Sequence, residues 1–164
     1  MGSPVPLREG KERMARLNDP FSELEESVME DMRRVYSETT IDHFLSPRNL
    51  GEIQAPDGYG RLTGPCGDTM QMCLKTNNGR VTNATFWTDG CGPSIASGSM
   101  VSEMARGRSI AEAHGVTQED IVDALGGLPE ESRHCALLAA NTLKVAIKDY
   151  LSCKNEPWKR AYRR

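Results

Sequence analysis

The chain has 164 residues, of which 38% are hydrophobic and 26% charged, and its net charge is −3 at pH 7. This composition is typical of a globular protein with one domain, and the slight acidic excess argues against nucleic-acid binding. The longest unbroken apolar run, CALLAA at 135–140, is much shorter than the roughly 18 residues of a membrane span. We therefore predict a protein that binds neither nucleic acid nor membrane.

The first residues carry no signal for export. Residues 1–20 mix proline, glycine and both charge signs without periodicity, where a signal peptide needs an apolar stretch. We predict a flexible tail there and a cytoplasmic location for the protein. Because thiols stay reduced in the cytoplasm, the five cysteines are expected to be free thiols, metal ligands or reactive groups rather than disulfides.

Residues 20–44 have the spacing of a helix. Apolar residues recur every three or four positions, as at Leu24 and Val28. Pro47 ends the pattern, because the residue before a proline disfavours the helical conformation. We predict one helix over this segment, and we assign a structural role to His43, which lies among its apolar residues.

Three short segments then have the pattern of strands. They lie at 59–63, 68–76 and 81–88, and Asn77-Asn78-Gly79 is typical of a hairpin turn between the last two. Apolar and polar residues alternate along the second segment, which places one set on each face of a sheet. We expect the core-facing set to be Met70, Met72, Leu74, Ala84 and Phe86, and the opposite face to carry Cys73, Thr85 and Trp87.

The rest of the chain is predicted to be mainly helical. The expected helices are 90–106, 109–114, 117–125 and 130–151. Because the strands precede these helices without strand–helix alternation, the predicted fold is α+β, a small three-stranded antiparallel sheet with helices packed mainly on one face. We expect the domain to span 21–151 and residues 152–164 to form a basic tail.

Cys66, Cys91 and Cys135 occupy positions that favour a reactive or metal-bound thiol. Cys66 lies in a loop, Cys91 at a strand-to-helix junction and Cys135 in the first turns of a long predicted helix, where the helix N-terminus favours a thiolate. Asp68 follows Cys66 by two residues and adds a hard ligand to a soft one. The gaps of 24 and 43 residues between the cysteines differ from the close pairs of zinc ribbons and ferredoxins. Spacing alone therefore leaves open both a shared metal site and buried cysteines that act as small apolar residues.

The motifs around these cysteines resemble those of a known family. GPCGDTM, DGCGPSIASGSM and SRHCALLAANTLKVAIKDY, with FLSPRNLG upstream, are similar in sequence and spacing to NifU/IscU-type iron–sulfur cluster assembly scaffold proteins. The resemblance covers about residues 36–151 and implies a SufE/NifU-like α+β fold in which three cysteines and an aspartate meet at one exposed edge. The ligands that it implies are Cys66, Asp68, Cys91 and Cys135, with His134 as an alternative ligand or proton carrier.

The resemblance also implies a function. Such a protein binds Fe²⁺ and sulfur, builds a labile cluster of the [2Fe–2S] type and transfers it to recipient apo-iron–sulfur proteins, and it is not an enzyme. Its sulfur comes from a cysteine desulfurase as a persulfide, for which Cys135 is the favoured first acceptor. Four thiolates hold a cluster durably, whereas three thiolates and a carboxylate leave one exchangeable corner. We expect Asp68 to supply that corner.

Two departures from the family pattern affect the expected partners. The family's chaperone-docking loop reads Leu-Pro-Pro-Val-Lys before the histidine and the third cysteine, whereas residues 128–133 read LPEESR. The reversed local charge argues against a dedicated Hsp70-type chaperone. The 43-residue gap between Cys91 and Cys135 also leaves no room for the insertion that marks the zinc-dependent SufU branch.

A zinc protein that relays sulfur from a cysteine desulfurase is the main alternative. The same four side chains would form a tetrahedral Zn²⁺ site, and Zn²⁺ is the ion that we would look for in the isolated protein. A purely structural zinc module is a third interpretation, which the extensive hydrophobic pattern makes unnecessary for folding. Cys73 and Cys153 belong to no motif, and we assign them no role.

Overall fold

A computed structural model describes residues 20–162 of the chain. The chain divides into two compact units, Met1–Val35 and Tyr36–Arg164. The tail predicted for residues 1–20 lies, apart from Pro20, outside the described residues and stays a prediction. In the first unit the described residues form helix α2 (Pro20–Val35), none of whose side chains is buried.

The single helix predicted over 20–44 is wrong at one point, because a second helix, α3 (Glu38–Leu45), begins after Ser37. Ser37 is extended, with φ −65° and ψ 156°, and its side chain accepts a hydrogen bond from the Thr40 backbone N–H. A serine that caps a helix in this way starts a new helix instead of continuing the previous one. The apolar spacing continues across the break, so the periodicity did not reveal it.

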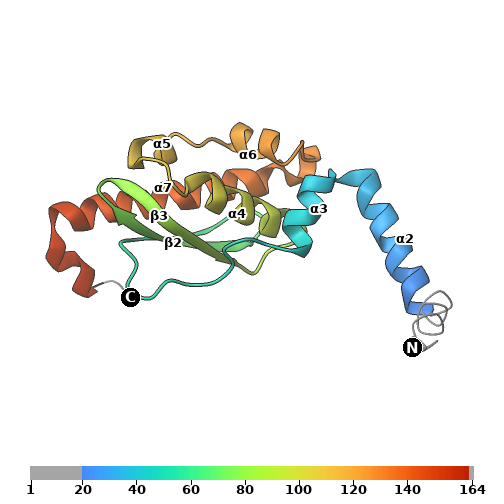
Figure 1. Cartoon of the computed structure of the whole chain (residues 1–164), viewed down its shortest axis with the longest axis horizontal. Coiled ribbons are helices and arrows are strands. Elements are labelled where there is room, and N and C mark those ends of the chain that lie inside the picture. Colours follow the sequence, from blue (N-terminus) through green and yellow to red (C-terminus); the bar gives the residue numbers. More distant parts are fainter. Residues whose placement is uncertain (1–19, 163–164) are drawn as a thin grey trace, which may run out of the picture. The chain divides into compact units, whose positions relative to one another are not determined.

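The second unit contains the predicted antiparallel sheet (Figure 1). Its strands are β1 (Gly58–Thr63), β2 (Thr69–Asn77) and β3 (Arg80–Thr88), hydrogen-bonded in the order β1-β2-β3. Asn78 and Gly79 connect β2 to β3 with φ angles of 50° and 75°. These positive angles are what a tight hairpin turn of this kind needs, and they favour asparagine and glycine.

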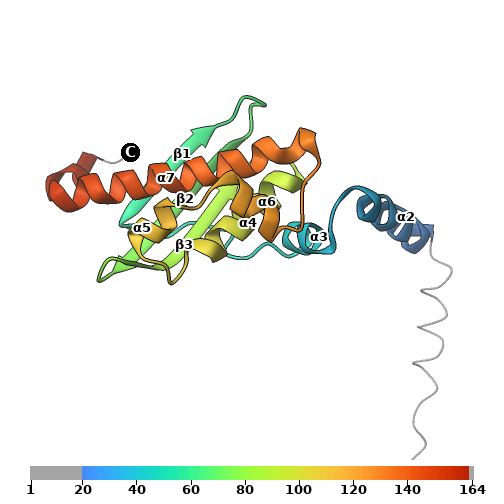
Figure 2. The same cartoon turned by 90° about the horizontal axis from the view of Figure 1, so that it is seen from above.

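Helices cover one face of this sheet (Figures 1 and 2). They are α4 (Gly92–Ala105), α5 (Ile110–His114), α6 (Gln118–Ala124) and α7 (Arg133–Asn155), with short 3₁₀ helices at η1 (Glu130–Ser132) and η2 (Pro157–Tyr162). Figure 2 shows α7 lying along β1 and β2. The predicted α+β fold is confirmed. Within residues 20–162, no helix is both long and apolar enough to cross a membrane.

The last helix is longer than predicted. It was expected to end at Leu151, but α7 continues to Asn155, and η2 follows within the segment expected to be a tail. Cys153 is therefore a buried residue of α7, and its thiol donates a weak hydrogen bond to Asp149 Oδ1 at 3.8 Å. The apolar stripe of the helix extends to this cysteine, which explains why the helix does not stop earlier.

The core lies between the sheet and the helices. Met70, Met72, Leu74, Ala84 and Phe86 are all buried, as the alternation predicts, together with Val101 of α4 and Leu143 and Ile147 of α7. Gly98 of α4 allows the helix to approach the sheet, because a Cβ there would lie 2.4 Å from Phe86 Cδ2. Close packing of this kind leaves no room for an added methyl group.

Cys73 lies on the face of the sheet opposite the methionines, as predicted. The prediction that it faces away from the core wrongly implies an exposed side chain, since only 5% of the residue is accessible. The connection between α3 and β1 crosses that face. Within this connection, the Gly51 N–H donates a hydrogen bond to Phe86 O of β3 at 2.8 Å. Farther along, Ala55 O accepts a hydrogen bond from the Lys75 ammonium at 2.7 Å. Trp87 lies farther along β3 and stays 39% exposed.

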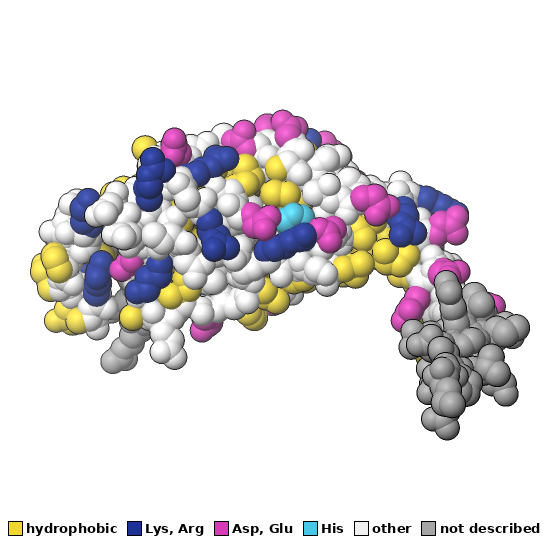
Figure 3. Space-filling view, viewed as in Figure 1, with side chains coloured by type: hydrophobic (Ala, Val, Ile, Leu, Met, Phe, Trp, Pro, Cys, Tyr) yellow, Lys and Arg dark blue, Asp and Glu magenta, His cyan; other side chains and the backbone are white. Residues whose placement is uncertain are grey.

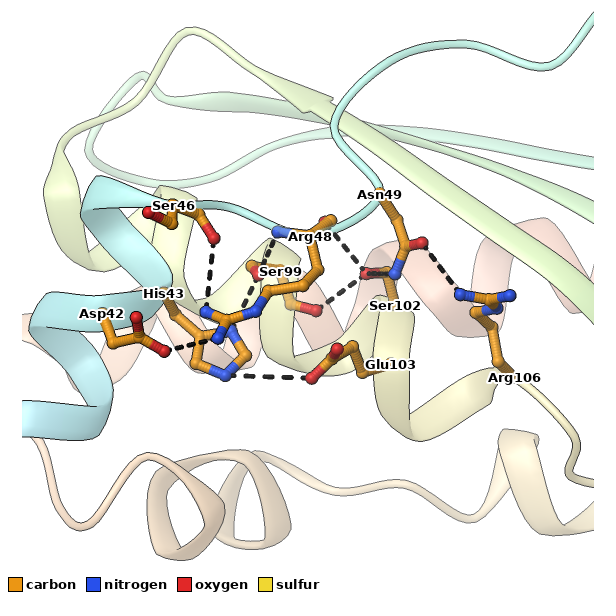
Figure 4. A network of polar contacts seen from close by, with 9 residues as sticks. All are labelled: Asp42, His43, Ser46, Arg48, Asn49, Ser99, Ser102, Glu103 and Arg106. Atoms are coloured by element: carbon orange, nitrogen blue, oxygen red, sulfur yellow. Dashed lines mark hydrogen bonds and ion pairs between the residues drawn. The ribbon is translucent and has the colours of Figure 1, made fainter. Parts of the chain in front are cut away.

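His43 joins α3 to α4 through a polar network (Figure 4). Its Nδ1 lies 2.7 Å from Ser99 Oγ, which also accepts the Arg48 backbone N–H at 2.8 Å. The other ring nitrogen, Nε2, lies 3.8 Å from Glu103 Oε2. Acidic and basic side chains lie near one another on the surface of this face (Figure 3).

Burial, and then the nearby Arg48 charge, lower the pKa of His43 below its ordinary value, although Glu103 and Asp42 oppose the shift.

We expect the stability that depends on neutral His43 to be lost as the medium becomes acidic. The unfolded chain titrates near the ordinary pKa of about 6.5, and the folded pKa is lower, so the unfolded state binds more protons between the two values. The contribution is therefore fully present above about pH 6.5 and declines as the pH falls through the folded pKa. Urea unfolding of wild type and His43→Gln should show a smaller stability difference at about pH 5.5 than at about pH 7.5. An equal difference at both values would contradict the lowered pKa of His43 in the folded state.

Candidate metal centre

Three side chains from separate elements meet at one end of the sheet. Asp68 precedes β2, Cys91 follows β3, and Cys135 lies in the first turn of α7. One ligand atom from each, a carboxylate oxygen or a thiol sulfur, lies within 4.8 Å of the other two. At this spacing the three side chains can bind the same metal ion or small cluster.

The hairpin between β1 and β2 positions Asp68. Its backbone carbonyl accepts the Gly64 N–H at 2.8 Å, which closes the loop. Next to it, the Thr69 N–H donates to Asp89 Oδ1 at 2.7 Å, and this bond ties the start of β2 to the end of β3. Asp68 is thus held next to the segment that carries Cys91.

Gly90 is required where these segments meet. A Cβ at this position would lie 2.6 Å from Asp68 Oδ2 and 2.7 Å from Ser94 Cβ. Only a glycine permits this approach of the backbone to the carboxylate. The glycine-flanked cysteine in the sequence therefore has a steric explanation in the fold.

Cys91 is the N-cap residue of α4, and its side chain makes no capping hydrogen bond to the helix backbone. Its exposed thiol lies 3.8 Å from Asp68 Oδ2, to which it can donate its proton. The position at the N-terminus of a 14-residue helix favours the thiolate, the form that binds metal or attacks sulfur.

Cys135 is the buried member of the group, with 1% of its surface accessible. Burial, and then the nearby negative charges of Cys91 and Asp68, raise the pKa of its thiol to about 12, although the neighbouring Ser94 hydroxyl opposes the shift. Without cargo the Cys135 thiol is therefore protonated. A bound cation favours the thiolate and reverses this preference.

Ser94 is a member of the site that sequence reasoning missed. It is completely buried in the first turn of α4, and its hydroxyl donates to Asp68 Oδ2 at 2.9 Å. The same oxygen lies 3.7 Å from Cys91 Sγ. The only sequence signal was a serine three residues after Cys91, which also fits an ordinary helix start.

The structure does not bring Cys66 and His134 into the group in the same way. Among residues 20–162, the group whose ligand atoms lie within 4.8 Å of one another contains neither of them. Cys66 is exposed at the tip of the hairpin, before Gly67 with φ 91°. His134 Nε2 lies 3.6 Å from Cys135 Sγ. Its side chain also lines a cavity of about 150 Å³ between the hairpin and α7, with Leu62, Pro65 and Leu138.

The chain is similar in sequence to proteins of known families. The family described as "NifU-like N terminal domain" matches residues 35–157. The chain is 44% identical over 117 residues to "Iron-sulfur cluster assembly scaffold protein IscU 1" of Archaeoglobus fulgidus, covering 71% of this chain and 76% of that protein. It is 43% identical over 122 residues to the IscU protein of Escherichia coli K12, covering 71% of this chain and 94% of that one.

Solved structures show the same fold. The N-terminal part of a NifU-like protein from Brucella abortus superposes with a TM-score of 0.58 at 19% identity, covering 72% of this chain and 95% of that one. A SUF-system scaffold described as putative, from Fervidobacterium islandicum, gives a TM-score of 0.56 at 21% identity, covering 68% and 96%. The match over most of the second unit, together with the identity to the two IscU proteins, confirms the predicted resemblance: the chain belongs to the NifU-like N-terminal domain family.

Proposed function

We propose that this protein is a scaffold on which an iron–sulfur cluster is assembled from Fe²⁺ and sulfide and from which the cluster passes to apo-proteins. Its family membership and the names of its relatives support this proposal. The observation that carries it is the convergence of one carboxylate and two thiols at a site where Cys91 is exposed and Cys135 is buried. Iron and sulfide are then cargo, held only until delivery.

The mixed ligand set suits temporary binding. Thiolates bind iron–sulfur clusters strongly, whereas a carboxylate is a harder and weaker ligand for the same iron. We assign Cys91 and Cys135 as two thiolate ligands and Asp68 as the exchangeable corner. Cys66, on the same hairpin as Asp68, is the third thiolate, and His134 beside Cys135 is an alternative ligand. The cluster that these ligands fit by family resemblance is of the [2Fe–2S] type.

Sulfur arrives from a cysteine desulfurase that carries a persulfide. Cys135 first passes its thiol proton to His134 Nε2, 3.6 Å away. The resulting thiolate attacks the outer sulfur, forming a new S–S bond, and the desulfurase cysteine leaves as a thiolate. Two electrons from a thiol reductant or an electron-transfer protein then convert the bound sulfur to sulfide. Because Cys135 is buried, this transfer requires the site to open, and closing the site afterwards keeps the sulfur from solvent.

Asp68→Ala is expected to slow delivery of the cluster. Without the carboxylate, an incoming thiol from the apo-protein has no weak ligand to displace, so the half-time of transfer to apo-ferredoxin should lengthen by about tenfold, on the order of one ligand-exchange step of 1.4 kcal/mol. The transfer is followed by the visible spectrum of the ferredoxin. Glu156→Ala removes a carboxylate at the far end of α7, where it pairs with Lys159, and it provides the control. Transfer from Asp68→Ala at the wild-type rate would remove Asp68 from this role.

The function itself is tested by anaerobic reconstitution with Fe²⁺, cysteine and a cysteine desulfurase, read by visible absorption and Mössbauer spectra, followed by addition of apo-ferredoxin. We expect a cluster to form and to appear on the ferredoxin. Tightly held Zn²⁺ with stimulation of the desulfurase, but no transferable cluster, would instead make the protein a zinc-dependent sulfur relay.

A further inference from the structure

The hydroxyl of Ser94 contacts two of the three converging side chains. It donates to Asp68 Oδ2 at 2.9 Å and lies 3.7 Å from Cys91 Sγ. A serine hydroxyl has a single proton and two acceptor sites. Because the short contact is to the carboxylate, we assign the Ser94 proton to Asp68.

The arrangement leaves the Asp68 carboxylate little freedom. Ser94 is completely buried, so water cannot replace it as the donor to Oδ2. The Gly90 backbone lies on the other side of the pair, where even a methyl group would lie 2.6 Å from Oδ2 and 2.8 Å from Ser94 Oγ. Oδ2, the carboxylate oxygen that lies 3.8 Å from Cys91 Sγ, is thus held by a charge-assisted hydrogen bond, which is stronger than a neutral one.

We propose that Ser94 is a positioning residue that holds the Asp68 carboxylate in the orientation in which it meets the metal bound by Cys91 and Cys135. This proposal rests on the function proposed above, because that function identifies the metal as the iron of a cluster. It does not require Ser94 to touch the cargo. Hydrogen bonds from a second residue orient ligating carboxylates at metal sites in general, and their loss weakens metal binding by about 10- to 100-fold.

Co²⁺ binding to the apo-protein tests this role without any cluster assembly. Ser94→Ala should lower the affinity for Co²⁺ by about tenfold, while the thiolate-to-cobalt absorption stays, because both cysteines still bind. Asp68→Ala should lower it at least as much. The double variant Ser94→Ala/Asp68→Ala should bind Co²⁺ no more weakly than Asp68→Ala alone, because Ser94 acts through Asp68.

Ser97→Ala is the matched control. Ser97 is also completely buried on α4, but its hydroxyl has no hydrogen-bond partner in the structure. Its removal should therefore leave Co²⁺ affinity unchanged and thermal stability unchanged or slightly higher. This control separates an effect on the site from the general effect of removing a buried hydroxyl from this helix.

The outcomes separate this inference from the proposed function. An unchanged or raised Co²⁺ affinity in Ser94→Ala, effects of the two substitutions that simply add, or an equal loss in Ser97→Ala would each overturn the positioning role. If the Co²⁺ results are as expected but reconstituted wild type passes no cluster to apo-ferredoxin, Ser94 positions Asp68 in a site that has another function. If both hold, Ser94→Ala should also lengthen the transfer half-time, by no more than Asp68→Ala does.

Discussion

Replacing Cys135 by serine is expected to prevent the protein from assembling a transferable cluster. Cys135 is the thiol that lies at the inner side of the site, within 4.8 Å of the ligand atoms of Asp68 and Cys91. Serine keeps the size and polarity of the side chain but removes the soft thiolate on which iron–sulfur binding depends. After anaerobic reconstitution, the visible absorption of the bound cluster should fall to about a tenth of the wild-type value or less.

Cys153→Ser is the matched control for this experiment. Cys153 is a buried cysteine of the same helix, α7, but its thiol hydrogen-bonds to Asp149, far along the helix from the site. Its replacement should leave cluster formation at the wild-type level, since it removes a buried thiol from α7 without touching the converging ligands. A cluster that forms equally well in Cys135→Ser would show that Cys135 is not a ligand.

Replacing Gly60 by alanine is expected to produce a large loss of stability. Gly60 lies on β1 against α7, and a Cβ there would lie 2.6 Å from Thr142 O and 2.7 Å from Ala146 N. Both atoms belong to the backbone of α7, so no side chain can rotate away and the helix itself must move. Overpacking of this kind costs typically 1–3 kcal/mol, and since the obstacle is backbone we expect about 3 kcal/mol, a fall in Tm on the order of 10 °C.

Gly115→Ala provides the comparison. Gly115 also has a negative φ, −76°, and a Cβ there would lie 3.4 Å from its nearest neighbour, Glu112 O. This is an ordinary van der Waals distance, so Tm should change by about 2 °C at most. Thermal unfolding followed by circular dichroism measures both variants. A Gly60→Ala protein as stable as Gly115→Ala would mean that α7 does not pack against β1 this closely.

The elements of the second unit could be predicted because their signals are local. Alternation at Met70, Met72 and Leu74 depends on neighbouring residues only, and the turn at Asn78 and Gly79 depends on two backbone angles. The break before α3 was missed for the same reason, since Ser37 satisfies the polar spacing of a continuous helix as well as it satisfies a cap.

Burial was less predictable than secondary structure. The side-chain alternation placed Cys73 opposite the methionines, but it contains no information about the connection that crosses that face and buries it. The apolar stripe of α7 continues to Cys153, yet its burial depends on what packs beside the helix. A residue's exposure is decided by segments distant in sequence, which periodicity does not describe.

The sequence by itself determined which side chains are candidates for the site, because the ligand chemistry of Cys66, Asp68, Cys91 and Cys135 is a property of the residues and their motifs. Only the tertiary structure decided how they meet: Asp68, Cys91 and Cys135 converge, whereas Cys66 stays at the exposed hairpin tip. It also placed Ser94 among them. The physical reason is that the distances within the site depend on how β2, α4 and α7 pack together, and that packing is set by close contacts of glycine and core residues far from the ligands themselves.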